Sequence, residues 1–157
     1  RDKVALMRTW RPRHAASIWL EVGHRLPIAG SSSGLAVLGA TTREEFADLL
    51  SDHPEPPLDG GSFDALRREG RDQLIGHGYA VVRNQLRYSP KISAVSVPFR
   101  SARLAGPVVF SCGALDDVLP DARIHAEVGP ALRDTVARLQ RLVCAEGRPA
   151  LSGALND

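Results

Sequence analysis

The chain has 157 residues, 43% of them hydrophobic, which is enough for one domain with a buried core and too few for two domains of ordinary size. Its formal net charge is only +2 and its arginines are spread along the sequence, so there is no basic stripe or tail of the kind that binds nucleic-acid phosphates. No apolar run approaches the roughly 20 residues that cross a bilayer, so we expect a soluble, cytoplasmic protein with no membrane partner.

The two cysteines, Cys112 and Cys144, lie in different contexts and form no Cys-x-x-Cys pair. We expect both to be free thiols in a reducing cytoplasm. The chain begins at Arg1 and almost at once enters the apolar run Val4 to Met7. We therefore expect a further segment upstream.

The first predicted elements are two short strands, at residues 3–10 and 16–22. Both stretches mix apolar and polar positions as half-buried strands do, and a proline-containing turn at 11–14 lies between them. The pattern predicts a β-hairpin.

The stretch from Val22 to Ala40 joins the second of these strands to a helix through small and hydroxyl residues. Gly23 and Pro27 end the strand, and Ser31 or Ser32 can cap the helix that follows. The free N–H groups of a helix start, at the positive end of its dipole, favour a carboxylate or another electron-rich group. An ordinary serine-capped helix has the same pattern, so this stretch alone does not establish a binding site.

Two more helices are predicted before the chain returns to strands. Residues 42–45, Thr-Arg-Glu-Glu, form a capping box that opens a short helix. Residues 52–61 are rich in proline and glycine and predict a surface loop. From Ser62 to about His77 the spacing of the apolar residues predicts another helix, which Gly76 or Gly78 ends.

Three strands and a long helix complete the chain. The strands are predicted at 79–82, 92–97 and 107–112, and consecutive strands without helices between them imply antiparallel pairing. Residues 120–145 predict a helix that Gly129-Pro130 kinks or divides. This order of elements predicts an α+β fold, with helices packed on an antiparallel sheet.

The sequence lacks the usual signatures of metal, nucleotide and hydrolase sites. Its histidines never fall at His-x-x-x-His or His-Glu-x-x-His spacing, and there is no GxSxG elbow, GxxxxGK[ST] loop or GxGxxG turn after a strand. We expect no metal, no cofactor and no catalytic residue. A nucleophilic site built from distant parts would use Cys112 with His77 or His24, but we favour Cys112 as a small buried residue at a strand end.

Apolar sheet positions next to a serine-lined helix start predict a pocket for a small molecule. Five motifs add to this prediction: Val-Gly-His-Arg-Leu-Pro-Ile at 22–28, Ser31-x-x-Gly34-x-Ala36-x-Leu38, Gly-Tyr-Ala-Val at 78–81, Ala-Val-Ser-Val at 94–97, and strand 108–113 followed by Leu119-Pro120. Together, and in this order, they resemble the C-terminal effector-binding domain of the IclR family of bacterial transcriptional regulators, over about residues 3–147.

The resemblance implies a GAF-like, or profilin-like, α+β fold with an antiparallel sheet of about six strands flanked by helices. It implies an effector-binding domain at residues 1–147 and a tail at 148–157 that we expect to be disordered. The family's winged helix-turn-helix DNA-binding domain would lie upstream and is absent from this chain. The implied partners are a small-molecule effector, further copies of the chain in a dimer or tetramer and, through the missing domain, promoter DNA.

The pocket positions of the family fall on eight residues of this chain: Ile18, Leu26, Ser32, Ser33, Val82, Ile92, Phe110 and Cys112. By this resemblance, Ser32 and Ser33 offer backbone N–H groups to the ligand. At Val82, Ile92, Phe110 and Cys112 the family often has polar or smaller residues. These departures make small oxo-acids doubtful ligands and favour a larger, more apolar effector of the aromatic kind.

Two alternatives remain open at this point. Phe110 would fill the pocket if the domain served only for dimerisation. In the second alternative, Cys112 or Ser33 would act as the nucleophile of a small hydrolase-like enzyme.

Overall fold

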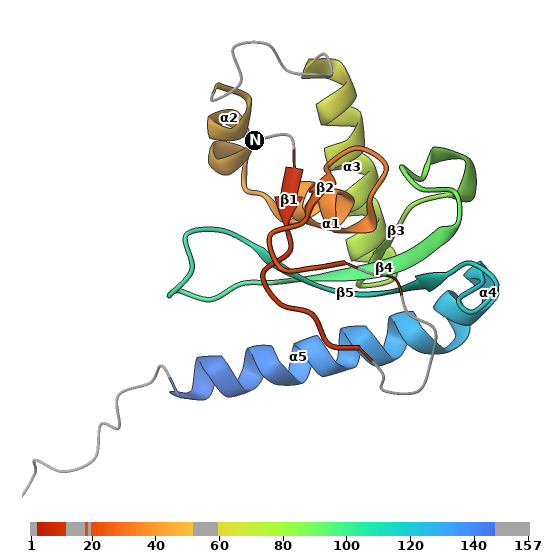
Figure 1. The fold of residues 1–157 in the computed structure, drawn as a ribbon. Helices are drawn as coiled ribbons and strands as arrows, with labels where there is room; N and C mark the ends of the chain where they lie inside the picture. Colours follow the sequence, from red (N-terminus) through yellow and green to blue (C-terminus); the bar gives the residue numbers. More distant parts are fainter. Residues whose placement is uncertain (1–2, 12–17, 19, 52–59, 147–157) are drawn as a thin grey trace, which may run out of the picture.

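The computed structural model describes residues 3–11, 18, 20–51 and 60–146, and most of these residues form three layers (Figure 1). The middle layer is an antiparallel sheet whose strands lie in the order β3 (Ala80–Val81), β4 (Ile92–Phe99) and β5 (Val108–Leu115). Helix α5 (Gly129–Glu146) runs along one face of the sheet, whereas α1 (Ser32–Ala40) covers the other, with α3 (Gly60–Gly76) packed against α1. The α+β class predicted from the sequence is confirmed.

Two further strands, β1 (Lys3–Ala5) and β2 (Arg25–Pro27), form a small antiparallel sheet in which Val4 faces Leu26. The predicted strand at 3–10 is thus much shorter, and its partner is not the stretch 16–22. The turn at Gly23, where φ is +90°, reverses the chain, and the Gly23 N–H donates to the Leu6 carbonyl over 2.8 Å. This reversal brings β2 back along β1.

The six-stranded sheet of the prediction is not found among the described residues, which form one sheet of three strands and one of two. Within the predicted strand at 16–22, Ile18 and residues 20–22 are not in a strand. The other positions of that strand, the turn after Arg11, most of the predicted loop at 52–61 and the predicted tail at 148–157 lie outside the described residues.

The capping box at 42–45 opens α2 (Arg43–Ser51) as predicted. The Thr42 N–H donates to Glu45 Oε2 over 2.8 Å, and the Glu45 N–H donates to Thr42 Oγ1 over 3.1 Å. The next helix, α3, begins at Gly60, so residues 60–61 are helical and the loop prediction is wrong at these two positions.

The predicted C-terminal helix is continuous through Gly129-Pro130, where the sequence predicted a kink or a division, and only its type of hydrogen bonding changes there. It begins as the single turn α4 (Asp121–Arg123), continues through one wide π-helical turn (Ile124–Val128) and then becomes α5. A Cβ on Gly129 would lie 2.7 Å from Cζ of Tyr79, so the glycine lets the helix pass against the tyrosine ring. Pro130 follows Gly129, and because it has no N–H it cannot donate to the π-helical turn before it, which interrupts the hydrogen-bond ladder there.

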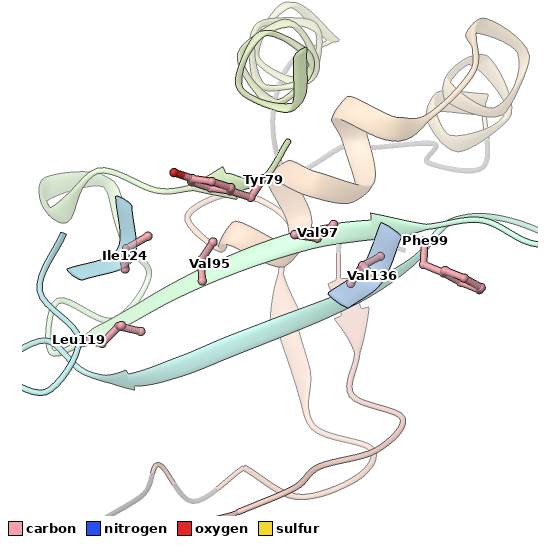
Figure 2. Packing of buried hydrophobic residues seen from close by; sticks show 7 residues of the cluster. All are labelled: Tyr79, Val95, Val97, Phe99, Leu119, Ile124 and Val136. Carbon is pink, nitrogen blue, oxygen red and sulfur yellow. The ribbon is translucent and has the colours of Figure 1, made fainter. Parts of the chain in front are cut away.

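The main core lies between the sheet and α5 (Figure 2). Alternate residues of β4 point to opposite faces, so Val95, Val97 and Phe99 all face α5, and Val136 of α5 packs against them. Tyr79, Leu119 and Ile124 complete this cluster. The face of β4 toward α1 therefore carries residues 92, 94, 96 and 98.

Arg100, directly after β4, joins both helical layers at one end of the sheet. Its guanidinium forms a bidentate ion pair with Glu45 of α2, at 2.9 and 2.5 Å, and it also donates to the carbonyl of Ala40 at the end of α1. Its backbone N–H donates to Oε1 of Gln140 in α5, and Nε2 of Gln140 donates back to its carbonyl over 2.6 Å.

We expect Glu45→Gln to lower the free energy of unfolding by about 1 kcal/mol at pH 7, because both side chains of the pair are partly exposed. The hydrogen bonds from Arg100 and from the Thr42 N–H lower the pKa of Glu45 from 4.5 to about 2. This stabilisation is present above about pH 4.5 and is lost as the pH falls toward 2. Urea denaturation should show the difference between wild type and variant shrinking by about half between pH 7 and pH 3. A constant difference would contradict the pair's role, and Asp48→Asn, exposed on the same helix, is the control.

Candidate functional site

The start of α1 is held by its own backbone and by Ser31. Ser31 has extended backbone angles, and its Oγ accepts the N–H of Gly34 over 3.0 Å and donates to the carbonyl of Pro27 over 2.5 Å. A Cβ on Gly34 would lie 2.2 Å from the carbonyl oxygen of Ile28, so the incoming chain wraps directly over the first turn. The geometry of a helix start leaves the N–H groups of Ser32 and Ser33 without intrahelical acceptors.

Four serine hydroxyls meet where this helix start reaches the sheet. Ser96 of β4 and Ser111 of β5 are cross-strand partners, and their Oγ atoms are 2.8 Å apart. Ser32 Oγ lies 2.9 Å from Ser96 Oγ, and Ser33 Oγ lies 2.9 Å from Ser111 Oγ. We call these four residues the serine cluster.

The serine cluster is buried on one side and open on the other. Ser32, Ser33 and Ser96 are only 4%, 6% and 0% exposed, whereas Ser111 is exposed. Hydroxyls both donate and accept, and the positive end of the α1 dipole lies beside them. The arrangement can therefore receive a carboxylate, a phenol or a carbonyl oxygen without a charged side chain.

The sheet surface beside the serine cluster carries small residues. The next cross-strand pair on the α1-facing side is Ala94 and Gly113, and the pair beyond it is Ile92 and Leu115. A Cβ on Gly113 would make only ordinary contacts, among them one at 3.9 Å to Cδ1 of Ile18. On this face of the sheet, the small side chains of Ala94 and Gly113 therefore leave a shallow area between the serine cluster and the larger apolar side chains of Ile92 and Leu115.

The structure brings only some of the predicted site residues together. Ser32 and Ser33 belong to the serine cluster, and Ile18 and Ile92 lie over the same face of the sheet. Val82 lies beside the helix start, at a cavity of about 30 Å³ that Ser31 and Leu35 also line. Leu26 is buried in β2, opposite Val4.

Phe110 and Cys112 lie on the face of the sheet toward α5, opposite the serine cluster. The prediction that they line the same pocket as Ser32 and Ser33 is therefore corrected. Both pack on the core beneath α5, where the Phe110 ring meets that of Phe99 edge to face at 5.9 Å. Burial raises the pKa of the Cys112 thiol. Strand residues alternate between faces, and Ser111, between these two, is the one that points to α1.

Sequence reasoning missed Ser96 and Ser111 as site residues. A signal was present: in Ala94-Val95-Ser96-Val97 the hydroxyl falls between two valines, as it does when the valines point to a core and the serine to the other face. The residues opposite Ser96 depend on the register between β4 and β5, which no short motif specifies.

We also searched the described residues for a metal site and for a membrane-spanning helix. No group of three or more His, Cys, Asp or Glu side chains among them could hold a metal ion. None of the helices in that part of the chain is both long and apolar enough to cross a bilayer.

Comparison with known proteins places this fold in a known class. No family model and no curated protein sequence matches the chain. Among solved structures it is similar to an IclR family transcriptional regulator from Brucella abortus, with 25% identity and a TM-score of 0.74 over 91% of this chain and 53% of that one.

Two further similar structures contain small molecules. The inducer-binding domain of the PobR transcription factor from Acinetobacter, a double mutant in complex with 3-hydroxybenzoic acid, is 21% identical with a TM-score of 0.63, over 90% of this chain and 83% of that one. An IclR homolog from Microbacterium hydrocarbonoxydans in complex with 4-hydroxybenzoate is 24% identical with a TM-score of 0.61, over 92% and 57%.

The fold is thus that of a domain found in bacterial transcriptional regulators. The structures that match are of the IclR family, and the family resemblance predicted from the sequence is confirmed. The chain spans about half the length of the Brucella and Microbacterium proteins.

Proposed function

We propose that this chain is the effector-binding domain of an IclR-type transcriptional regulator and that the effector binds at the serine cluster. The observation that carries the proposal is the meeting of a helix start with four hydroxyls on a sheet face that continues over small residues. A ligand's polar end would accept from the N–H groups of Ser32 and Ser33 and from the exposed hydroxyl of Ser111, whose Oγ lies 2.8 Å from that of the buried Ser96.

The effector we propose is a small aromatic acid or phenol. A flat ring would lie over Ala94 and Gly113, where no side chain larger than a methyl group rises from the sheet. Ile18, Leu26, Val82 and Ile92 would supply apolar walls, each contributing up to about 1.5–3 kcal/mol where the ligand covers it fully. The hydroxybenzoates bound by two regulators of similar fold have this chemistry.

In the proposed regulator, an upstream winged helix-turn-helix binds promoter DNA, and copies of this domain hold the protein in a dimer or tetramer. The effector shifts DNA affinity only by its differential affinity for the two arrangements of the assembly. We place the domain at residues 1–147.

The two alternatives lose their specific support. The dimerisation-only alternative requires Phe110 to fill the pocket, but that side chain lies under α5. The enzyme alternative requires an activated nucleophile, whereas Cys112 lies on the far face with a raised pKa and Ser33 is hydrogen-bonded only to other hydroxyls among the described residues.

A thermal-shift screen of this chain against hydroxybenzoates, phenols and small oxo-acids tests the proposal. A ligand present at 100 times its dissociation constant should stabilise the fold by about 2.7 kcal/mol, or roughly 5–10 °C. We expect the shift with the aromatic acids and expect Ser33→Trp, which fills the helix start, to abolish it.

Gly113→Leu is a second blocked variant, since the fold has room for a Cβ there, and Ser51→Trp, exposed at the end of α2, is the control. Equal shifts in wild type and both blocked variants would place the ligand elsewhere. No shift with any class would leave a domain kept for assembly alone.

A further inference from the structure

The small cavity beside the helix start has a carboxylate in its wall. This cavity, of about 30 Å³, lies between the first turn of α1, the middle of α3 and the chain that follows β3. Glu69 of α3 is the only one of its described lining residues with an ionisable side chain, and it is half-buried. Most of the remaining wall is apolar, with the side chains of Leu35, Leu66, Val82 and Leu86. A carboxylate in such a wall favours an occupant that donates a hydrogen bond.

Gln73, one turn further along α3, holds Glu69 in place. The backbone N–H of Val81 donates to Gln73 Oε1 over 2.8 Å, and Gln73 Nε2 donates back to the Val81 carbonyl over 3.1 Å. The same Nε2 donates to Oε1 of Glu69 over 3.3 Å. Oε2 of Glu69 has no hydrogen-bond partner among the described residues. Because an ionised carboxylate has about four acceptor sites, Glu69 can still accept from a ligand.

Val82 connects this cavity to the proposed effector site. The register of β3 on β4 places Val82 level with Ala94, which is itself opposite Gly113 of β5. Val82 packs with Leu35 on the side of the sheet toward α1. These positions of the three strands therefore form one row, which runs from beside the serine cluster to the cavity that Glu69 lines.

We propose that Glu69 determines the specificity of the effector site by accepting from a donor group, a hydroxyl or an amino group, at the end of an aromatic acid opposite its carboxylate. This inference rests on the proposed function. The ligand's carboxylate lies at the N–H groups of Ser32 and Ser33, and its ring lies along the row. The row crosses two strand spacings, about 10 Å in all, which a para-substituted benzoate bridges when each end forms a hydrogen bond. The cavity has room for about two waters, and the donor group takes the place of one.

The charge of Glu69 also decides which ligands are rejected. A hydrogen bond to a carboxylate is about twice as strong as one between neutral groups, so a hydroxyl gains more here than at a neutral acceptor. Benzoate offers no donor at this end, and 2-hydroxybenzoate has its donor beside the carboxylate instead. Terephthalate places a second negative charge against Glu69, and this repulsion excludes it.

Titration calorimetry of the chain with these four acids tests the assignment. We expect 4-hydroxybenzoate to bind at least about tenfold more tightly than 2-hydroxybenzoate, benzoate or terephthalate. Glu69→Gln removes the charge but keeps an oxygen that accepts from Gln73, and it should bring 4-hydroxybenzoate, benzoate and terephthalate to within about threefold of one another. Asp72→Asn makes the same charge change at an exposed position of α3 and should leave the wild-type order unchanged.

The outcomes separate this inference from the proposed function. If Ser33→Trp abolishes binding but Glu69→Gln keeps the full preference for 4-hydroxybenzoate, the effector site stands and the role of Glu69 is wrong. Wild-type binding of benzoate or terephthalate as tight as that of 4-hydroxybenzoate would overturn it in the same way. Binding of none of the four acids, or equal binding to Ser33→Trp, would reject the effector site and the role of Glu69 together. Circular dichroism of Glu69→Gln verifies its fold before the titration.

Discussion

Gly70→Ala should lower the free energy of unfolding by about 3 kcal/mol, at the upper end of the range for overpacked cores. A Cβ on Gly70 would lie 2.3 Å from the carbonyl oxygen of Leu35 and 3.2 Å from Cα of Gly39. These contacts are with the backbone of α1, which cannot move aside as a flexible side chain does. Helices α1 and α3 must move apart, and α1 would then lose part of its packing against the sheet.

Gly76→Ala is the matched control for this prediction. It makes the same substitution in the same helix, but nothing lies within 4 Å of the added Cβ. Urea denaturation should give a midpoint for Gly76→Ala that is equal to or above that of the wild type. Similar midpoints for the two variants would mean that α1 and α3 do not touch backbone to backbone.

Phe63→Ala should cost about 3–5 kcal/mol, the range for emptying a large buried aromatic site. Phe63 is 1% exposed and packs in the cluster that joins α1, α2 and α3, with Leu38, Phe46 and Ile28. Because Leu38 is on the helix that carries Ser32 and Ser33, loss of this cluster would also loosen the proposed effector site.

The control for Phe63→Ala is Ile75→Ala on the same helix, where the side chain is 76% exposed. It should change stability by no more than about 0.5 kcal/mol. Thermal and urea unfolding of both variants measure the difference directly. Equal losses in the two variants would contradict the burial of Phe63 in a shared core.

Local signals in the sequence predicted the helices well. The capping box at 42–45 and the serine cap of α1 can be recognised in the sequence, because their hydrogen bonds join residues only three positions apart. The long-range pairings were harder. The sequence suggested that residues 3–10 pair with the next apolar stretch, whereas β1 pairs with 25–27, beyond the turn at Gly23.

The proposed site was predictable in part. Ser32 and Ser33 follow from the helix start, which is local. The family motif placed the strand positions on Phe110 and Cys112, one residue away from Ser111, and a shift of one residue moves a side chain to the other face of a sheet. Only the β4–β5 register brings Ser96 opposite Ser111, and that register is a property of the whole sheet.

Arg100 holds the helices on the two sides of the sheet together at one end of the molecule. At the end of β4 it ties α1 and α2 on one side of the sheet and α5 on the other, through Ala40, Glu45 and Gln140. If the layer of α1 and α2 tilted relative to α5, the axis of that rotation would therefore lie near Arg100. The displacement would grow from Arg100 toward the start of β4, so the serine cluster, at the middle of β4, would move with it.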